Sequence, residues 1–425
     1  MLKKLSILLL ALFISFPLFA VPEMIKDPFP IEEELKSFPF YNSRGYEEEF
    51  LDECEINLIT VSPGKEIFSY FGHTALELNT SSFPSIFFDT GIFSYTDTFV
   101  KDLLQGRLLF GAYRSYGDLV RASFEEQWRE VITLPLDLTN DAKAGTIDFT
   151  TYHAKSENHI YLYDYYFDNC ATRIRDIVNK ALDGKLEEFG VSIEEGTTFR
   201  KLTTTYMTRS WPINFTFNFL EGPSIDRPIT RYEAAFIPER LDTLVRDYQA
   251  GTVTKTEYPL YSSTMSLTFE TLTISTFTVI ALYLLLQTKG NGLKRLSHFI
   301  SFLIYLYLGG LASVLFYMQN FSYHQVTYNN ENLFIISPLI LILALEQIIC
   351  VFKLDHRSRL ATFVVYLSIF SAIILLLLKG LFMNTFSQNN FYVFALIAPF
   401  YFFEAARHKK MEKTKTEKSK FFNYL

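Results

Sequence analysis

The sequence predicts an exported domain of mixed α and β structure, followed by an all-α membrane domain of five spans. Three observations support this prediction. The 425-residue chain is 49% hydrophobic and 17% aromatic, which is too apolar for an ordinary soluble enzyme. Its first twenty residues have the pattern of a secretory signal. Apolar stretches of spanning length begin only near residue 264, and shorter strand and helix patterns precede them.

The N-terminal segment, residues 1–20, is interpreted as a signal peptide. It has a positive end at Lys3 and Lys4, then an apolar stretch, and Ala20 stands at a plausible cleavage site. No cysteine follows Ala20 directly, so the chain is not expected to be a lipoprotein itself. Because Leu18 occupies a position that usually holds a small residue, an uncleaved anchor helix is the alternative. Either form exports the segment that follows.

Five apolar stretches are long enough to cross about 30 Å of hydrocarbon. They are roughly residues 266–288, 297–318, 333–352, 360–382 and 390–406. Lysine and arginine gather in the loops after the first and third stretches and in the basic tail, whereas the other loops hold almost none. The positive-inside rule therefore places the tail in the cytoplasm. The expected segments are 1–20 signal, 21–262 exported domain, 263–408 membrane domain and 409–425 cytoplasmic tail.

Charge and motif content exclude several classes of partner. The chain has a formal net charge of −7 although its tail is basic, so the exported domain is strongly acidic. Nucleic acid needs a positive surface and is excluded as a partner. The basic tail is typical of a stop signal on an anionic leaflet, with a specific partner site as the alternative. No phosphate-binding glycine loop or metal-ligand spacing occurs, so we expect no metal and no other cofactor.

The exported domain begins with a proline- and glutamate-rich lead-in, residues 22–53, that we expect to be irregular. Three strands follow, "EINLITVSPG", "YFGHTALELN" and "PSIFFDTG", the last stopping at Gly91. "DTFVKDLLQG" predicts a helix that ends at Gly106. "FEEQWREVITLPL" mixes helix and strand patterns. A further helix should open near Thr139, whose side chain suits a helix start.

The clearest helix pattern follows Cys170 in "YYFDNCATRIRD". Its apolar positions recur at spacings of three and four and are Ile174, Ile177, Val178, Ala181 and Leu182. Charged residues such as Arg173 should lie around this stripe. Asp168 or Asn169 is suited to cap the start of the helix. One of only three cysteines in the chain is therefore expected at the first turn of a helix.

Cys170 is the candidate nucleophile. The N–H groups and the dipole at a helix start favour a thiolate, and the same N–H groups can hold a developing oxyanion. Two other interpretations remain open, a disulfide with Cys54 in the oxidising compartment and a buried inert thiol. Cys350 lies within a span and should only pack there. Glu346, deep in the third span, implies either an interhelical polar contact or a functional role.

A thiolate nucleophile needs a base, and the exported domain offers three histidines. His73 lies on a predicted strand in "FGHTAL", after Gly72, which lets another backbone approach closely. His153 and His159 are nearer to Cys170 in sequence but are flanked by polar residues typical of loops. His73 could also be a hydrogen-bonded sheet histidine without a catalytic role.

Several motifs together resemble the exported domain of the Lnb-type lipoprotein N-acyltransferases. They are "FGHTALEL", "FFDTG", "LLQGRLLFGAY", "ENHIYLYDYYFDNCATRIRDIV" and "FLEGPSIDRPITRYEAAFIPERL", and they span roughly residues 55–245. Five spans after this domain fit the same family. The histidine-first order also resembles the circularly permuted papain-like fold of lecithin:retinol-acyltransferase-type and NlpC/P60-type enzymes. The resemblance implies that fold, with the cysteine-led helix packed on a small antiparallel sheet that carries the histidine.

Carried over motif by motif, the resemblance implies a role for each site residue. Cys170 would be the nucleophile and His73 the general base, and Asp89 would orient the imidazole. The substrate-binding or supporting residues of the same motifs are Asn169, Arg173 and Tyr163. For Arg173 the alternatives are an ion pair within the domain and contact with a lipid phosphate.

The implied activity is lipoprotein N-acyl transfer at the bacterial inner membrane. An acyl chain would pass from a membrane phospholipid, through a thioester on Cys170, to the α-amine of a diacylglyceryl-cysteine on an apolipoprotein. The alternative is a membrane-anchored cysteine hydrolase, either phospholipase A-like or a cell-wall peptidase or amidase. A sensor or transporter is a third possibility, although no pair of interrupted spans marks a transport site.

Overall fold

The computed structural model describes residues 35, 38, 45–253, 266–354 and 356–422, with side chains as far as 409. The chain divides into two compact units. Among the described residues, the α+β unit comprises 35, 38, 45–207 and 227–253, and the helical unit comprises 208–226, 266–354 and 356–422. The predicted signal lies outside the described residues, as does most of the lead-in. The lead-in is not irregular throughout, because Glu48–Glu53 forms helix α3.

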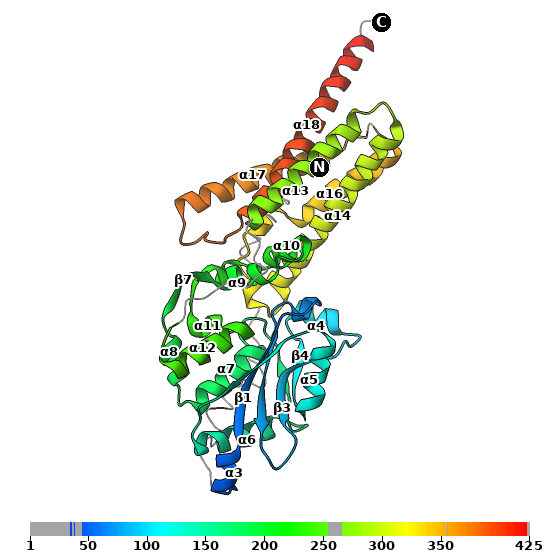
Figure 1. Ribbon diagram of the computed structural model, residues 1–425. Helices are drawn as coiled ribbons and strands as arrows, with labels where there is room; N and C mark the ends of the chain where they lie inside the picture. The colour runs from blue at the N-terminus through cyan, green and yellow to red at the C-terminus, as the bar shows by residue number, and fades with distance from the viewer. Residues whose placement is uncertain (1–34, 36–37, 39–44, 254–265, 355, 423–425) are drawn as a thin grey trace. The chain divides into compact units, whose positions relative to one another are not determined.

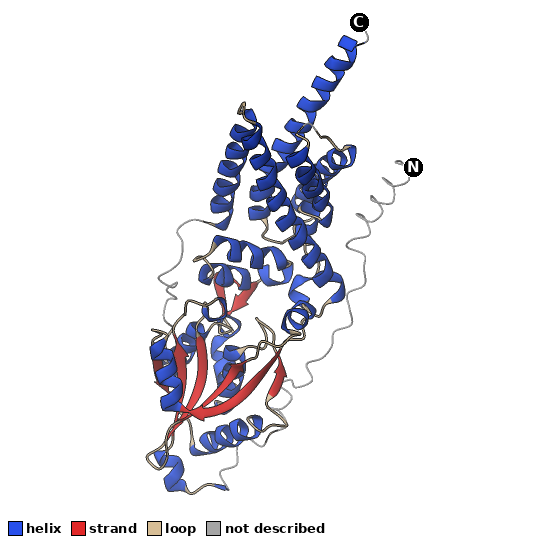
Figure 2. Ribbon diagram, turned by 90° about the vertical axis from the view of Figure 1, so that its right-hand side faces the viewer, coloured by secondary structure: helices blue, strands red, loops and turns tan. Residues whose placement is uncertain are grey.

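A six-stranded antiparallel sheet forms the centre of the α+β unit (Figures 1 and 2). Its strands are β1 (Glu55–Val61), β2 (His73–Asn79), β3 (Ile86–Ile92), β4 (Leu109–Tyr116), β5 (Val131–Pro135) and β6 (Ile160–Leu162). The spatial order is β5-β1-β2-β3-β4-β6. The three strands predicted from the sequence are β1 to β3, and β3 runs one residue beyond Gly91. At one end of the sheet, Val61 pairs with both His73 and Val131.

The two faces of the sheet are covered by different helices. Successive side chains of a strand point to opposite faces, so neighbouring apolar residues enter separate cores. Leu76 and Phe88 belong to a large core shared with α6 (Asn140–His153) and α7 (Cys170–Ala181). Ala75 and Phe87 belong to a smaller core, against which Phe124 of α5 (Gly117–Glu126) packs. The strands are therefore apolar on both faces, which is why they read as nearly continuous hydrophobic runs.

The other elements of this unit are short. They are η3 (Ile67–Ser69), α4 (Phe99–Gln105), α8 (Lys185–Gly190), β7 (Ile193–Thr198), α9 (Phe199–Tyr206), β8 (Pro228–Thr230), α11 (Arg231–Ala234) and α12 (Pro238–Ala250). As predicted, α4 ends at Gly106 and Thr139 caps α6. The mixed stretch contains the end of α5 and all of β5, separated by a short turn. The α+β class is confirmed, whereas the papain-like fold stays a prediction.

Four segments of the helical unit are long and apolar enough to cross a membrane, among the residues searched. They are α13 (Leu267–Gln287), α14 (Asn291–Phe321), the segment Asn332–Phe352 and α17 (Arg359–Leu381). The third is interrupted, because α15 (Asn332–Ile335), η6 (Pro338–Ile340) and α16 (Leu341–Phe352) are separate elements. Ile336 and Ser337 are extended where the break occurs, and Pro338 cannot donate a helical hydrogen bond.

The fifth predicted span stays a prediction. Its residues begin α18 (Phe391–Phe422), which continues without a break into the basic tail. The unit also contains α10 (Trp211–Leu220), η4 (Pro223–Asp226) and η5 (Gln325–Thr327). The first two come from the segment that was expected within the exported domain. The main chain joins this segment to the helical unit, because Gly222 N–H donates to the Val326 carbonyl at 2.6 Å.

Gly72 fixes the approach of β1 to the start of β2. Its φ is +84°, and a Cβ at this position would lie 2.6 Å from the carbonyl oxygen of Val61. Gly184 has a similar φ of +80° but open space around it. We predict that Gly72→Ala lowers the midpoint of thermal unfolding by about 3–10 °C more than Gly184→Ala, because only the former adds steric overlap.

The measurement is circular dichroism of the purified full-length variants during heating. The Gly184→Ala variant is the matched control, since it carries the same left-handed backbone penalty without the clash. Equal unfolding midpoints for the two variants would show that β1 moves to accommodate the added methyl group without loss of stability.

Candidate active site

The start of α7 is fixed by Asn169. Cys170 is the first residue of the helix, and the Asn169 Oδ1 accepts the N–H groups of Ala171 at 2.8 Å and Thr172 at 2.9 Å. The Thr172 hydroxyl in turn accepts the N–H of Asn169 at 2.7 Å, which completes a capping box. Of the two candidate caps in the sequence, Asn169 rather than Asp168 has this role. The cap determines where the thiol stands relative to the helix.

The amide nitrogen of Asn169 ties two further segments to this point. It donates to the carbonyl of Tyr165 at 2.7 Å and to the carbonyl of Phe236 at 3.1 Å. Both oxygens belong to non-helical backbone around the helix start. Asn169 is itself buried. Its role in the structure is therefore to support the position of Cys170.

His73 lies between Asp89 and Cys170. Its Nε2 is 3.0 Å from Oδ2 of Asp89 on the neighbouring strand, and the charge of Cys170 acts on the imidazole from close by. Because Nε2 is used by the carboxylate, Nδ1 is the ring nitrogen left for the thiol. Asp89 Oδ1 accepts the N–H of Gly91 at 2.6 Å. A Cβ at Gly91 would lie 2.6 Å from Cε1 of His73, so glycine leaves the space that the imidazole occupies.

The three side chains form a coupled charge system. Burial lowers the pKa of His73, but Asp89 and Cys170 outweigh burial and hold that pKa well above its ordinary value. Burial raises the pKa of Asp89, yet the imidazole and the Gly91 N–H outweigh it, and the pKa is lowered. The charges around His73 therefore favour its protonated form. A charged imidazole beside a cysteine favours the reactive thiolate.

The other histidines and cysteines of the unit lie elsewhere. His153 is buried, and its Nε2 is 3.0 Å from Nη1 of Arg173. His159 packs against the ring of Tyr113. Cys54 is buried, Cys170 is half-buried, and both are free, so the alternative disulfide between them is not formed. Of the three histidines that the sequence offered, the structure places His73 beside Cys170, and its role as the base stays a prediction.

Of the two alternatives for Arg173, the ion pair within the domain is the one that forms. The Arg173 side chain is 0% exposed and pairs with both carboxylate oxygens of Asp168, at 2.5 and 2.7 Å. The guanidinium also lies over the ring of Tyr161, 3.5 Å from the centroid. These contacts and the one with His153 enclose it, so it does not present a group to a lipid phosphate. Sequence reasoning missed this cluster, because its partners come from three separate segments.

Tyr163 directly follows strand β6 and lies within electrostatic range of Cys170. Its ring stacks on Phe110 with centroids 4.0 Å apart, and its N–H donates to the Leu108 carbonyl. Burial and then the charge of Cys170 raise the pKa of the phenol, so it remains a neutral hydroxyl. The position fits a supporting role, and a substrate contact by this hydroxyl stays a prediction.

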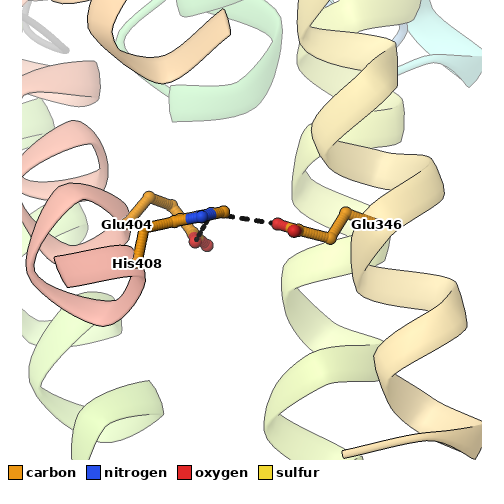
Figure 3. A group of neighbouring side chains, drawn as sticks. All are labelled: Glu346, Glu404 and His408. Carbon is orange, nitrogen blue, oxygen red and sulfur yellow. Dashed lines mark ion pairs between the residues drawn. The ribbon is translucent and has the colours of Figure 1, made fainter. Parts of the chain in front are cut away.

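A second cluster of titratable groups lies in the helical unit. Figure 3 shows Glu404 and His408 of α18 directed toward Glu346 of α16. One nitrogen or oxygen atom from each of the three side chains lies within 4.8 Å of the others, which is close enough to bind a metal ion together. Arg407, however, is 2.7 Å from a carboxylate oxygen of each glutamate and already supplies a positive charge. The arrangement is therefore an interhelical ion-pair network, one of the two roles considered for Glu346.

The contact between Asp89 and His73 gives a pH-dependent prediction. Asp89→Asn removes the negative charge that raises the His73 pKa, so the imidazole gives up its proton at lower pH and supports less thiolate. The rate of Cys170 alkylation by iodoacetamide at pH 7 should fall roughly tenfold or more, and the rate should rise with pH only in a higher range.

Glu77→Gln is the matched control for this prediction. Glu77 is a buried carboxylate on the same strand as His73, but it pairs with Arg121. This variant should keep the wild-type pH profile. An unchanged profile in Asp89→Asn would mean that the carboxylate does not set the charge of the imidazole.

The comparisons agree with the position of this site in the chain. Neither a curated protein nor a solved structure matches the chain. Residues 46–205 match the family described as the Lnb N-terminal periplasmic domain, and this range contains Cys170, His73 and Asp89. Together with the four apolar segments, the match indicates an inner-membrane protein with a periplasmic domain, and residues 46–205 are similar to the Lnb family.

Proposed function

We propose that this protein is a thiol-dependent lipoprotein N-acyltransferase. The observation that carries the proposal is the hydrogen-bonded pair Asp89–His73 beside Cys170, with the cysteine at the first position of α7, inside a segment that matches the Lnb periplasmic domain. A nucleophile bonded to a base that a third group orients is the arrangement of covalent acyl-transfer sites. Four segments long and apolar enough to cross a membrane support lipids as the substrates.

In the first step Cys170 takes the acyl chain from a phospholipid. The sulfur attacks the ester carbonyl carbon, and the carbonyl electron pair moves onto oxygen. When the carbonyl re-forms, the bond to the glycerol oxygen breaks. That oxygen takes the proton held by His73 and leaves as a lysophospholipid. The products are a thioester on Cys170 and a neutral imidazole.

In the second step the acyl chain moves to an amine. The α-amino group of a diacylglyceryl-cysteine attacks the thioester carbon, and the carbon–sulfur bond breaks. The neutral imidazole of His73 accepts a proton from the nitrogen, while the sulfur leaves as a thiolate. A triacylated lipoprotein results, and the imidazolium–thiolate pair is restored. No redox partner or metal is needed for this balance.

The chemistry suits a thiol at a membrane surface. A thioester is reactive enough for an amine to open it, and exclusion of water limits the competing hydrolysis. The same residues would catalyse hydrolysis of the thioester if water replaced the amine in the second step. Acyl transfer is favoured here by the match to the Lnb domain, which supports a role in lipoprotein processing. The product assay below distinguishes the two reactions.

We predict that Cys170→Ala abolishes N-acylation of lipoproteins in a strain that has no other such enzyme. Mass spectrometry of lipoprotein N-terminal peptides should then show only the diacylated form, because the variant has no sulfur to carry the acyl chain. The activity is expected to fall below detection. Fully triacylated peptides in the Cys170→Ala strain would exclude the proposed function.

Cys54→Ser provides the matched cysteine control. Cys54 is a buried, free thiol at the end of α3, away from the series of His73 and Asp89. Its replacement should leave triacylation largely intact. Release of free fatty acid by the wild-type protein, without any triacylated peptide, would instead identify a phospholipase.

A further inference from the structure

The cap of α7 occupies three of the hydrogen-bond donors at the helix start. Attack on an ester or thioester places a negative charge on the carbonyl oxygen, and sites of this kind supply donors for it. The N–H groups of Ala171 and Thr172 are already bound by the side chain of Asn169, and that of Arg173 donates to the Asn169 carbonyl. A donor for the oxyanion beyond the N–H of Cys170 itself therefore has to come from another segment.

Arg129 lies at the same end of the sheet as His73. It precedes β5 by two residues, and Val61 of β1 pairs both with Val131 of β5 and with His73 of β2. The rings of Phe124 and His73 are in contact, with centroids 6.1 Å apart, and the Arg129 guanidinium lies 5.0 Å from the Phe124 centroid. Phe124 is thus the shared neighbour of the catalytic imidazole and the guanidinium.

The backbone around Arg129 is held in an unfavourable conformation. Trp128 has a φ of +57°, which is strained for a residue with a side chain. This turn reverses the chain after α5, so that Arg129 N–H donates to the Phe124 carbonyl at 3.0 Å. The side chain is then anchored by its Nε, which donates to the Ser62 carbonyl at 2.8 Å. The guanidinium is therefore positioned by contacts on one side only.

One nitrogen of the guanidinium, Nη2, has no hydrogen-bond partner among the described residues. Arg129 is 8% exposed, and its Nη2 is buried without a hydrogen bond to any described residue. A buried cationic donor left unpaired costs free energy in the resting protein. Burial lowers the pKa of Arg129 and the charge of Cys170 acts in the opposite direction, so the two groups are within electrostatic range. Such a donor is prepared for a negative oxygen that forms beside the sulfur.

We propose that Arg129 is a further catalytic residue, whose Nη2 donates to the oxyanion formed when an ester or thioester carbonyl is attacked at Cys170. The inference rests on the proposed acyl transfer. In both steps the carbonyl π electrons move to oxygen as the new bond to carbon forms, and they return as the old bond breaks. Arg129 donates a hydrogen bond to this oxygen and transfers no proton. One donor therefore serves both tetrahedral intermediates.

The test compares two reactions of the same thiol in the purified full-length protein. Acylation of Cys170 by p-nitrophenyl octanoate passes through an oxyanion, whereas alkylation by iodoacetamide does not. In Arg129→Met the ratio of the acylation rate to the alkylation rate should fall by about 10²-fold, the effect of removing one such donor. Intact-protein mass measurement after each reaction identifies the modified protein, and Cys170→Ser gives the background.

Two variants separate the donor from the fold. Ser62→Ala removes the hydrogen bond that the Ser62 hydroxyl makes with Glu130 N–H at the same junction, but it keeps the guanidinium. It should retain the wild-type ratio. Arg129→Lys keeps a cation at the site, but its ammonium group has a different reach. Its ratio of acylation rate to alkylation rate should lie between those of wild type and Arg129→Met. If Arg129→Met fails to fold, judged by its thermal midpoint, the lysine variant decides.

Each remaining outcome overturns the inference in a recognisable way. If the rates of acylation and alkylation fall equally, Arg129 acts by stabilising the thiolate of Cys170 and not the oxyanion. A fall with micellar phosphatidylglycerol as donor, but none with the phosphate-free octanoate ester, would assign it to the lipid phosphate. An unchanged ratio would leave it without a catalytic role. If the wild-type protein forms no acyl-enzyme at Cys170, the proposed function fails first.

Discussion

The side chain of Asn169 determines the arrangement on which the site depends. Its oxygen accepts two helix N–H groups and its nitrogen donates to two carbonyls, so its hydrogen-bonding capacity is fully used. One buried amide thereby joins the tyrosine-rich segment, the start of α7 and the chain at Phe236. Cys170 is positioned as the next residue along. The same bonds occupy donors that a helix start would otherwise offer to a substrate.

The local parts of this fold could be predicted from the sequence, because their signals lie within a few residues. Alternation and turn residues predicted β1 to β3, and the 3.6-residue period predicted α7 after Cys170. The grouping of Thr208–Asp226 with the helical unit was not predictable in this way, since it depends on contacts with distant loops. The break before Pro338 was likewise overlooked, because mean apolarity continues across it.

The site was predictable to the extent that its residues belong to recognisable motifs. Cys170, His73 and Asp89 could be named before the structure, although only strand pairing shows that Asp89 reaches the imidazole. For Arg173 the sequence left an ion pair and a lipid contact as alternatives, because it does not show which side chains surround the guanidinium. A long side chain can leave its own face when an acidic partner and an aromatic ring enclose its end. No local pattern distinguishes Arg129 from any other arginine before a strand.

Two buried arginines lie near Cys170, and their different surroundings suit a structural role for one and a chemical role for the other. Arg173 is enclosed by a carboxylate, an imidazole and an aromatic ring, so its charge is balanced in the resting protein. Arg129 has one carbonyl on Nε, an aromatic ring beneath it and an unpaired Nη2. A buried cationic nitrogen without a hydrogen-bond partner is unfavourable in the resting protein. That cost is offset only in the state where a negative oxygen forms beside the sulfur, and stabilisation confined to that state lowers the barrier.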